Sequence, residues 1–124
     1  MKGTQASDAY RLSGNGATTL DPGEVDDILY VVGSGAAYAN TGGGDDTIVI
    51  NDTRAGTVYT KGAVCNDVIL GGAGANYEVF GAGSDLLGAG TGSNALLGGI
   101  GDDTFSMSFS QLDADTTVEI NDSA

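Results

Sequence analysis

Hydrophobic residues recur along this chain at a fixed interval of nine positions, with a glycine-rich polar stretch between them. Residues 62–106 divide without a gap into GAVCNDVIL, GGAGANYEV, FGAGSDLLG, AGTGSNALL and GGIGDDTFS. If one residue is skipped at Val31 and three at positions 50–52, the same frame extends back to Ser13 and yields ten units. So short a period predicts units that stack on one another, because no single unit can bury its own apolar side.

Each unit is expected to form a six-residue turn followed by a three-residue strand. Glycine favours the second and fourth places, where a tight turn needs positive φ, and an apolar residue favours the eighth, which a strand can point inward. Two units then complete one coil. The sequence therefore predicts an all-β chain, a parallel β-roll or β-solenoid with two nonapeptide units, or 18 residues, per coil.

The two units of a coil differ at their sixth and eighth places. When the units are numbered from Ser13, every even unit has an aspartate in sixth place and no odd unit does. Even units stack directly above one another at the ~4.8 Å spacing of a sheet, so these side chains should form one column along one edge. The column comprises Asp27, Asp46, Asp67, Asp85 and Asp103. The even strands also hold most of the large apolar residues in eighth place, and are expected to carry most of the core.

Glu78 occupies one of the inward eighth places and is the least expected residue there. Two explanations are open from the residues alone. Either the strand slips locally so that Val79 points inward, or the carboxylate has a cationic partner.

The repeat defines the expected organisation of the chain. Residues 13–106 form the roll, and residues 1–12 precede it as an N-terminal cap or a tag remnant. In residues 107–124 the alternating runs MSFS and TTVEI indicate one or two irregular closing strands, which would cover the end of the solenoid.

Composition and charge narrow the partners. The chain has 17 acidic and 4 basic residues, a net charge of −13, which argues against nucleic acid and anionic lipid. No apolar run approaches the ~18 residues that span a bilayer, so no membrane insertion is expected. The single Cys65 excludes an internal disulfide, and with no histidine present zinc, iron and copper sites have little to build from. Cations that prefer oxygen ligands remain the natural partners.

Stacked carboxylates at one sheet spacing repel by about 1 kcal/mol per pair even in bulk water. A hard cation removes this cost, and calcium takes six to eight oxygen ligands from carboxylates and main-chain carbonyls. The glycine-rich turns expose such carbonyls beside the aspartates. The residues therefore favour Ca²⁺ as the ligand of the column.

These repeats resemble the nonapeptide GGxGxDxUx, with U a large apolar residue, of the RTX (repeats-in-toxin, haemolysin-type calcium-binding) family. Residues 98–106, GGIGDDTFS, match at every constrained position, and TGGGDDTIV and FGAGSDLLG each miss only the first glycine. The resemblance covers roughly residues 13–106. It implies a calcium-binding β-roll module of a larger protein that a Gram-negative bacterium secretes, often by a type I system, and that folds on meeting extracellular calcium.

The resemblance also implies a ligand set for each ion between two stacked turns. The lower turn supplies the carbonyls of its second and fourth residues and its aspartate, and the upper turn those of its first and third residues and its aspartate. The best pair is Gly81, Gly83 and Asp85 below Gly98, Ile100 and Asp103. The pair beneath it uses Ala63, Cys65 and Asp67 with Phe80, Ala82 and Asp85, although glycine is missing at 63 and 65. Gly42 and Gly44 serve with Asp46 in the pairs built on Asp27, Asp46 and Asp67, of which at least one is expected to form.

The odd-numbered edge keeps the glycines of its turns but has no carboxylate in sixth place. Asn76 and Asn94 occupy that place in two of its units. Without charge a hard cation gains too little to leave water, so we expect a hydrogen-bonded ladder of asparagines there in preference to a metal site.

Other functions fit these residues less well than calcium binding. Acidic pairs such as Asp102 and Asp103 can be imagined as glycosidase carboxylates, but the repeat offers no cleft and accounts for both positions, so no enzyme activity is expected. Cys65 has no histidine to activate it and is expected to be structural. Adhesion to a cell surface or to ice would need a regular rank of Thr or Asn, which the odd edge lacks. A polysaccharide-binding accessory module has some support from tyrosines on the strands, but the chain offers only four cationic side chains.

Overall fold

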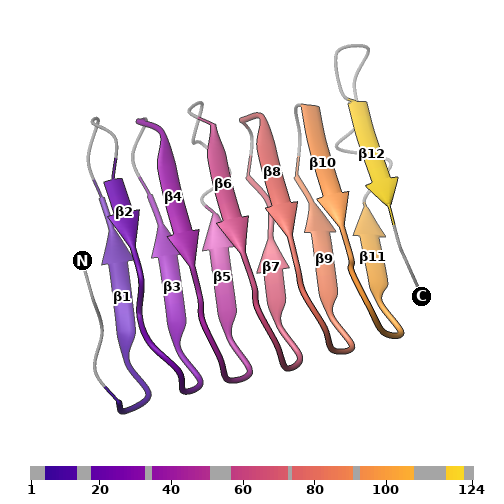
Figure 1. Cartoon of the computed structure of the whole chain (residues 1–124). Helices are drawn as coiled ribbons and strands as arrows, with labels where there is room; N and C mark the ends of the chain where they lie inside the picture. The colour runs from indigo at the N-terminus through magenta and orange to yellow at the C-terminus, as the bar shows by residue number, and fades with distance from the viewer. Residues whose placement is uncertain are drawn as a thin grey trace.

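The computed structural model describes residues 5–13, 18–32, 35–50, 57–72, 74–90, 93–107 and 117–121, and these form a β-solenoid of two parallel sheets (Figure 1). The first sheet has six strands, namely β1 (Ala9–Leu12), β3 (Ile28–Val31), β5 (Thr47–Ile50), β7 (Val68–Leu70), β9 (Leu86–Ala89) and β11 (Thr104–Met107), paired in that order. The second has β2 (Thr18–Leu20), β4 (Ala37–Asn40), β6 (Val58–Lys61), β8 (Asn76–Val79), β10 (Ser93–Leu97) and β12 (Thr117–Asn121). The predicted all-β roll is confirmed.

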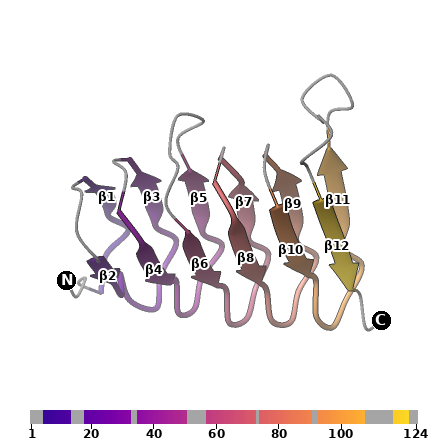
Figure 2. The same ribbon diagram turned by 90° about the horizontal axis from the view of Figure 1, so that it is seen from above.

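The chain alternates between the sheets, so each coil adds one strand to each (Figure 2). Neighbouring coils pair in a register that aligns the predicted inward residues, for example Leu29 with Ile48 and Ile69 with Leu87. The strands alternate buried and exposed residues, as a period of two requires. Two nonapeptide units therefore make one coil.

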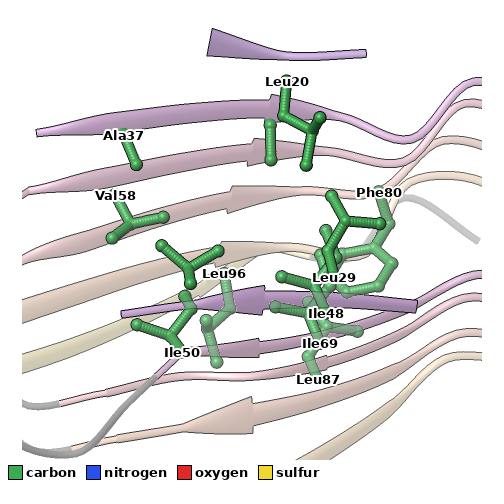
Figure 3. Close-up of a cluster of buried hydrophobic side chains, with 12 residues drawn as sticks. Leu20, Leu29, Ala37, Ile48, Ile50, Val58, Ile69, Phe80, Leu87 and Leu96 are labelled. Atoms are coloured by element: carbon green, nitrogen blue, oxygen red, sulfur yellow. The ribbon is translucent and has the colours of Figure 1, made fainter. Parts of the chain in front are cut away.

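The core is a thin layer between the two sheets. Leu29, Ile48, Ile69 and Leu87 follow one another along the first sheet, and the second sheet contributes Leu20, Val58 and Leu96 (Figure 3). All of these side chains are at most 1 % exposed. Because each coil buries only a few apolar side chains, the coils depend on one another for their stability.

The sheets extend beyond the nonapeptide frame at both ends. β1 lies within residues 1–12 and pairs with β3 from Ala9↔Ile28 to Leu12↔Val31. β12 lies within residues 107–124 and pairs with β10 in the parallel register of the other coils. Both segments thus continue the roll as regular strands.

Glycines shape the turns that connect the second sheet to the first. Gly42 and Gly44 adopt φ values of 87° and 104°, and Gly101 one of 143°. Cys65 holds the same fourth place as Gly44 and Gly101 and adopts φ 85°, the one positive φ of a non-glycine residue among the described residues. The turn conformation is therefore kept where the sequence lacks the glycine, at the steric cost of a side chain in the left-handed region.

Candidate metal centre

The five aspartates of even units form one column, hereafter the Asp column, at the turns drawn at the lower end of Figure 1. Each aspartate directly precedes a strand of the first sheet, so that strand pairing stacks the aspartates as well. The backbone N–H of each of the first four donates to Oδ1 of the next aspartate along the chain. The distances are 2.8 Å from Asp27 to Asp46, 2.9 Å from Asp46 to Asp67, 2.8 Å from Asp67 to Asp85 and 3.0 Å from Asp85 to Asp103.

A sixth aspartate extends this column at its N-terminal end. The backbone N–H of Asp8 donates to Oδ1 of Asp27 at 2.7 Å, and Oδ2 of Asp8 accepts from the Tyr10 hydroxyl at 2.8 Å. Sequence reasoning placed residues 1–12 outside the roll and missed Asp8. The available signal was spacing, since Asp8 precedes Asp27 by the same 19 residues that separate Asp27 from Asp46.

The second oxygens of the Asp column are buried without a partner. Oδ2 of Asp27, Asp46, Asp67, Asp85 and Asp103 lies out of solvent, and no described protein group hydrogen-bonds to it. The first four of these residues are at most 2 % exposed. Unpaired buried carboxylate oxygens are costly, so a column of them requires protons or cations.

Burial also makes three of these carboxylates, those of Asp46, Asp67 and Asp85, harder to ionise. It raises the pKa of Asp67 to about 7, and the charges of Asp46 and Asp85 act in the same direction. Burial likewise raises the pKa of Asp46 to about 6 and raises that of Asp85. Hydrogen bonds from the neighbouring backbone, and for Asp46 also one from the Thr41 side chain, oppose these increases without cancelling them. Near neutral pH, these three residues hold negative charge only at a free-energy cost.

The turn backbones beside the column are joined from coil to coil. Gly81 O accepts from Ile100 N at 2.9 Å, Ile100 O from Gly83 N at 3.0 Å, and Ala82 O from Cys65 N at 2.9 Å. Ala63 O accepts from Ala82 N at 3.2 Å. Four of the carbonyls implied as ligands, those of Ala63, Gly81, Ala82 and Ile100, thus already accept one hydrogen bond. A carbonyl oxygen has two lone pairs, so each retains capacity for a further contact. The implied ligands Phe80, Gly98, Gly42 and Gly44 lie in the same series of turns.

A second ladder runs along the exposed side of these turns, one residue before the column. Asp45 N donates to Asp26 Oδ1 at 2.8 Å, Asn66 N to Asp45 Oδ1 at 2.9 Å, and Ser84 N to Asn66 Oδ1 at 2.8 Å. In this ladder each backbone N–H donates to a side chain of the preceding coil, whereas in the Asp column each donates to the following coil. The two opposed ladders therefore fix the stacking of successive turns.

The opposite edge carries the asparagine ladder that the sequence predicted. Asn76 Nδ2 donates to Asn94 Oδ1 at 2.9 Å, and also lies within hydrogen-bonding distance of Gly74 O at 3.1 Å and Gly72 O at 3.3 Å. Asn94 Nδ2 donates to Gly90 O at 3.1 Å. The asparagine amides thus supply donors to the turn carbonyls, which a carboxylate in sixth place cannot do.

The donor set of the Asp column fits a hard cation. It consists of carboxylate oxygens and main-chain carbonyls; the chain has no histidine, and its one thiol, that of Cys65, is exposed. Within the described ranges, no three side chains of His, Cys, Asp or Glu converge on one point. Any ion held here would therefore depend on carbonyls as much as on the aspartates.

Comparisons with protein-family models, curated proteins and solved structures produced no match to this chain. The resemblance to the RTX nonapeptide accordingly stands on the residues that carry it. Among the described residues, no helix has the length and apolar character needed to cross a membrane.

Proposed function

We propose that this chain is a calcium-binding β-roll module of the RTX type, part of a larger secreted protein, in which ions held along the Asp column stabilise the fold. The observation that carries the proposal is the row of buried Oδ2 atoms, one per coil, for which the described protein groups provide no donor. The acidic composition and the oxygen-only donor set support it.

Asp67, Asp85 and Asp103 with the carbonyls of residues 80–83 and 98–100 are the groups that would hold calcium at the C-terminal turns. A bound divalent cation would supply positive charge that offsets carboxylate repulsion and satisfies the buried oxygens. The chain's own residues do the rest: the ladders hold the turns in register, and the glycines with positive φ direct the backbone around each corner.

Coupling between binding and folding follows from this arrangement. A ligand that binds only the folded chain stabilises it by RT ln(1 + [L]/Kd) at each site. Sites with Kd of roughly 10⁻⁴ to 10⁻³ M, as in extracellular modules, would respond to millimolar calcium. We therefore propose a chain that is unfolded at low calcium, folds outside the cell, and has no catalytic role of its own.

Far-ultraviolet circular dichroism in chelator and in millimolar calcium, combined with calorimetric titration of calcium, tests the proposal. We expect calcium to induce the β signal and to bind to more than one site. Asp85→Asn should lower the number or affinity of the ions, because two of the proposed ligand sets share this residue. Asp102→Asn is the matched control, since it removes the same charge from an exposed position next to the column. A β-rich chain that neither changes with calcium nor binds it would refute the proposal.

The polysaccharide alternative finds little support in the tyrosine row of the second sheet. Tyr38 and Tyr59 stack with ring centroids 4.9 Å apart, and Tyr59 and Tyr77 with centroids 5.1 Å apart. Both faces of the Tyr59 ring are therefore covered by neighbouring rings. For a sugar ring this leaves the edges of the row and the outer faces of its two end rings, Tyr38 and Tyr77.

A further inference from the structure

Glu78 lies in the interior of the roll, on the sheet that bears the asparagine ladder. Its side chain is 0 % exposed, whereas Tyr77 points outward and Val79 is half-buried, so β8 does not slip. Space for it exists because of Gly71. Val49 pairs with Leu70, so the residues that follow them, Ile50 and Gly71, occupy equivalent positions in successive coils. Ile50 buries a large side chain there, whereas Gly71 has none. A Cβ at Gly71 would lie 2.8 Å from the backbone atoms Gly88 O and Gly90 N and 2.9 Å from Glu78 Oε1, so the carboxylate and the backbone of the next coil together occupy the volume that a side chain would take there.

Two strand neighbours of Glu78 also carry buried polar oxygens without partners. Neither Oε1 nor Oε2 of Glu78 has a hydrogen-bond partner among the described residues, and the same holds for Thr60 Oγ1 and Asn76 Oδ1. Thr60 is the strand neighbour of Glu78 in register, and Asn76 is the next inward residue of β8. Thr60 is 0 % exposed and Asn76 3 %. Three adjacent buried side chains thus present four unsatisfied oxygens on the same side of β6 and β8.

The carboxylate is also electrically isolated. Burial alone raises the pKa of Glu78 to about 8, with no neighbouring charge or hydrogen bond contributing to the change. The cationic partner that sequence reasoning considered is therefore not a side chain of the described part of the protein. A buried carboxylate without such a partner must take up a proton or a cation.

We propose that Thr60, Asn76 and Glu78 form an internal site for a monovalent alkali cation, separate from the Asp column and beside the edge whose repeat units have no aspartate in sixth place. The oxygens are of the types that hard cations prefer: carboxylate, hydroxyl and amide carbonyl. The single negative charge of the Glu78 carboxylate favours a monovalent ion. One carboxylate neutralises one positive charge, whereas a divalent ion would leave a net charge in a low-dielectric interior. The site does not depend on the proposed calcium function.

Thermal unfolding in the presence of alkali cations tests this site. The chain is unfolded in millimolar calcium at about pH 9, above the pKa of Glu78, so that the proton competes little for the carboxylate. Choline chloride is meanwhile replaced stepwise by sodium or potassium chloride at constant ionic strength. Calcium is constant throughout, so occupancy of the Asp column does not vary with the alkali concentration. We expect the wild-type midpoint to rise with the logarithm of alkali concentration above Kd.

Three variants define which side chain is responsible. Glu78→Gln keeps the volume but loses the charge, and should abolish the rise. Thr60→Val keeps the shape but loses one oxygen, and should raise the alkali concentration needed for half of the effect several-fold. Glu24→Gln removes a charge from an exposed position and should retain the full wild-type response.

Two results would overturn the proposal. One is an equal alkali response in wild type and Glu78→Gln, and the other is no response in the wild type, which would indicate a protonated Glu78 served by buried water. If Glu78→Gln does not fold, ²³Na line broadening by the wild-type chain, reversed by excess potassium, replaces it. Absence of that broadening would then decide against the site. Failure here leaves calcium-dependent folding intact, and a chain indifferent to calcium can still show the alkali response.

Discussion

Replacing Asp67 by asparagine should change the stability of the roll in opposite directions with and without calcium. Asp67 is 2 % exposed and lies between Asp46 and Asp85 in the Asp column. Asparagine retains an oxygen to accept the Asp46 N–H but carries no charge. The substitution therefore removes the cost of burying a carboxylate and, at the same time, removes a proposed calcium ligand.

The magnitude follows from the pKa of Asp67, which burial raises from 3.8 to about 7. A difference of about three pKa units corresponds to about 4 kcal/mol for ionising the folded chain. Solvent screening at the edge of the roll reduces this to about 2 kcal/mol. In chelator at about pH 8, Asp67→Asn should raise the unfolding midpoint by roughly 10 °C. If the wild type is unfolded there, the same gain appears as recovered β signal.

In millimolar calcium the order should reverse. Asp67 belongs to two of the proposed ligand sets, those shared with Asp46 and with Asp85, so its loss weakens both. Chemical or thermal unfolding followed by circular dichroism measures both arms, with Asp102→Asn as the control that removes an exposed charge. A shift of the unfolding midpoint in the same direction in chelator and in calcium would refute the reasoning. It would mean that the carboxylate whose burial is costly is not the one that binds the metal.

Three further outcomes follow from the turns and the column. In chelator, the free energy of unfolding should increase as the pH falls from about 8 to about 5. Asp46 and Asp67, with pKa values of about 6 and 7, take up protons in the folded chain at a higher pH than in the unfolded chain. Denaturant titrations at several pH values measure this, and an opposite trend contradicts it. Cys65→Gly should stabilise the roll by about 1 kcal/mol, because glycine adopts the φ of 85° without the steric cost of a side chain. Denaturant midpoints measure this, and an unchanged midpoint would show that the turn holds the cysteine without strain. Gly42→Ala should destabilise the roll by at least about 2 kcal/mol, because the new Cβ would overlap the backbone of the preceding coil. Gly43→Ala is the control, since its Cβ meets only ordinary contacts and should change the stability little. Equal effects of the two variants on the thermal midpoint would argue against the packing described.

The repeat made the architecture readable from the chain alone. A nine-residue period with glycines at two places and an apolar residue at a third admits one arrangement, because each short strand can bury its side chain only against the next coil. The alternation of acid and amide in sixth place then predicts that Asp27, Asp46 and their successors share one edge. The structure places them there, and the predicted pairing of Asn76 with Asn94 is present as well.

Other features depended on contacts between coils. Asp8 was missed because the residues before it do not follow the repeat, although strand pairing brings it into line with Asp27. Cys65 follows the turn of its neighbours since the stacked backbones on either side impose it, whatever its own preference.

Sequence alone determined which residue types face inward and which edge is acidic, because a fixed period converts position in the chain into position in space. It left open whether Glu78 turned inward, because a strand can slip by one residue without changing its composition. The tertiary structure decided this through packing: the room left by Gly71 in one sheet receives the Glu78 carboxylate from the other. Matching of volumes across the core is a relation between residues of different strands, and only the folded coil brings those residues together.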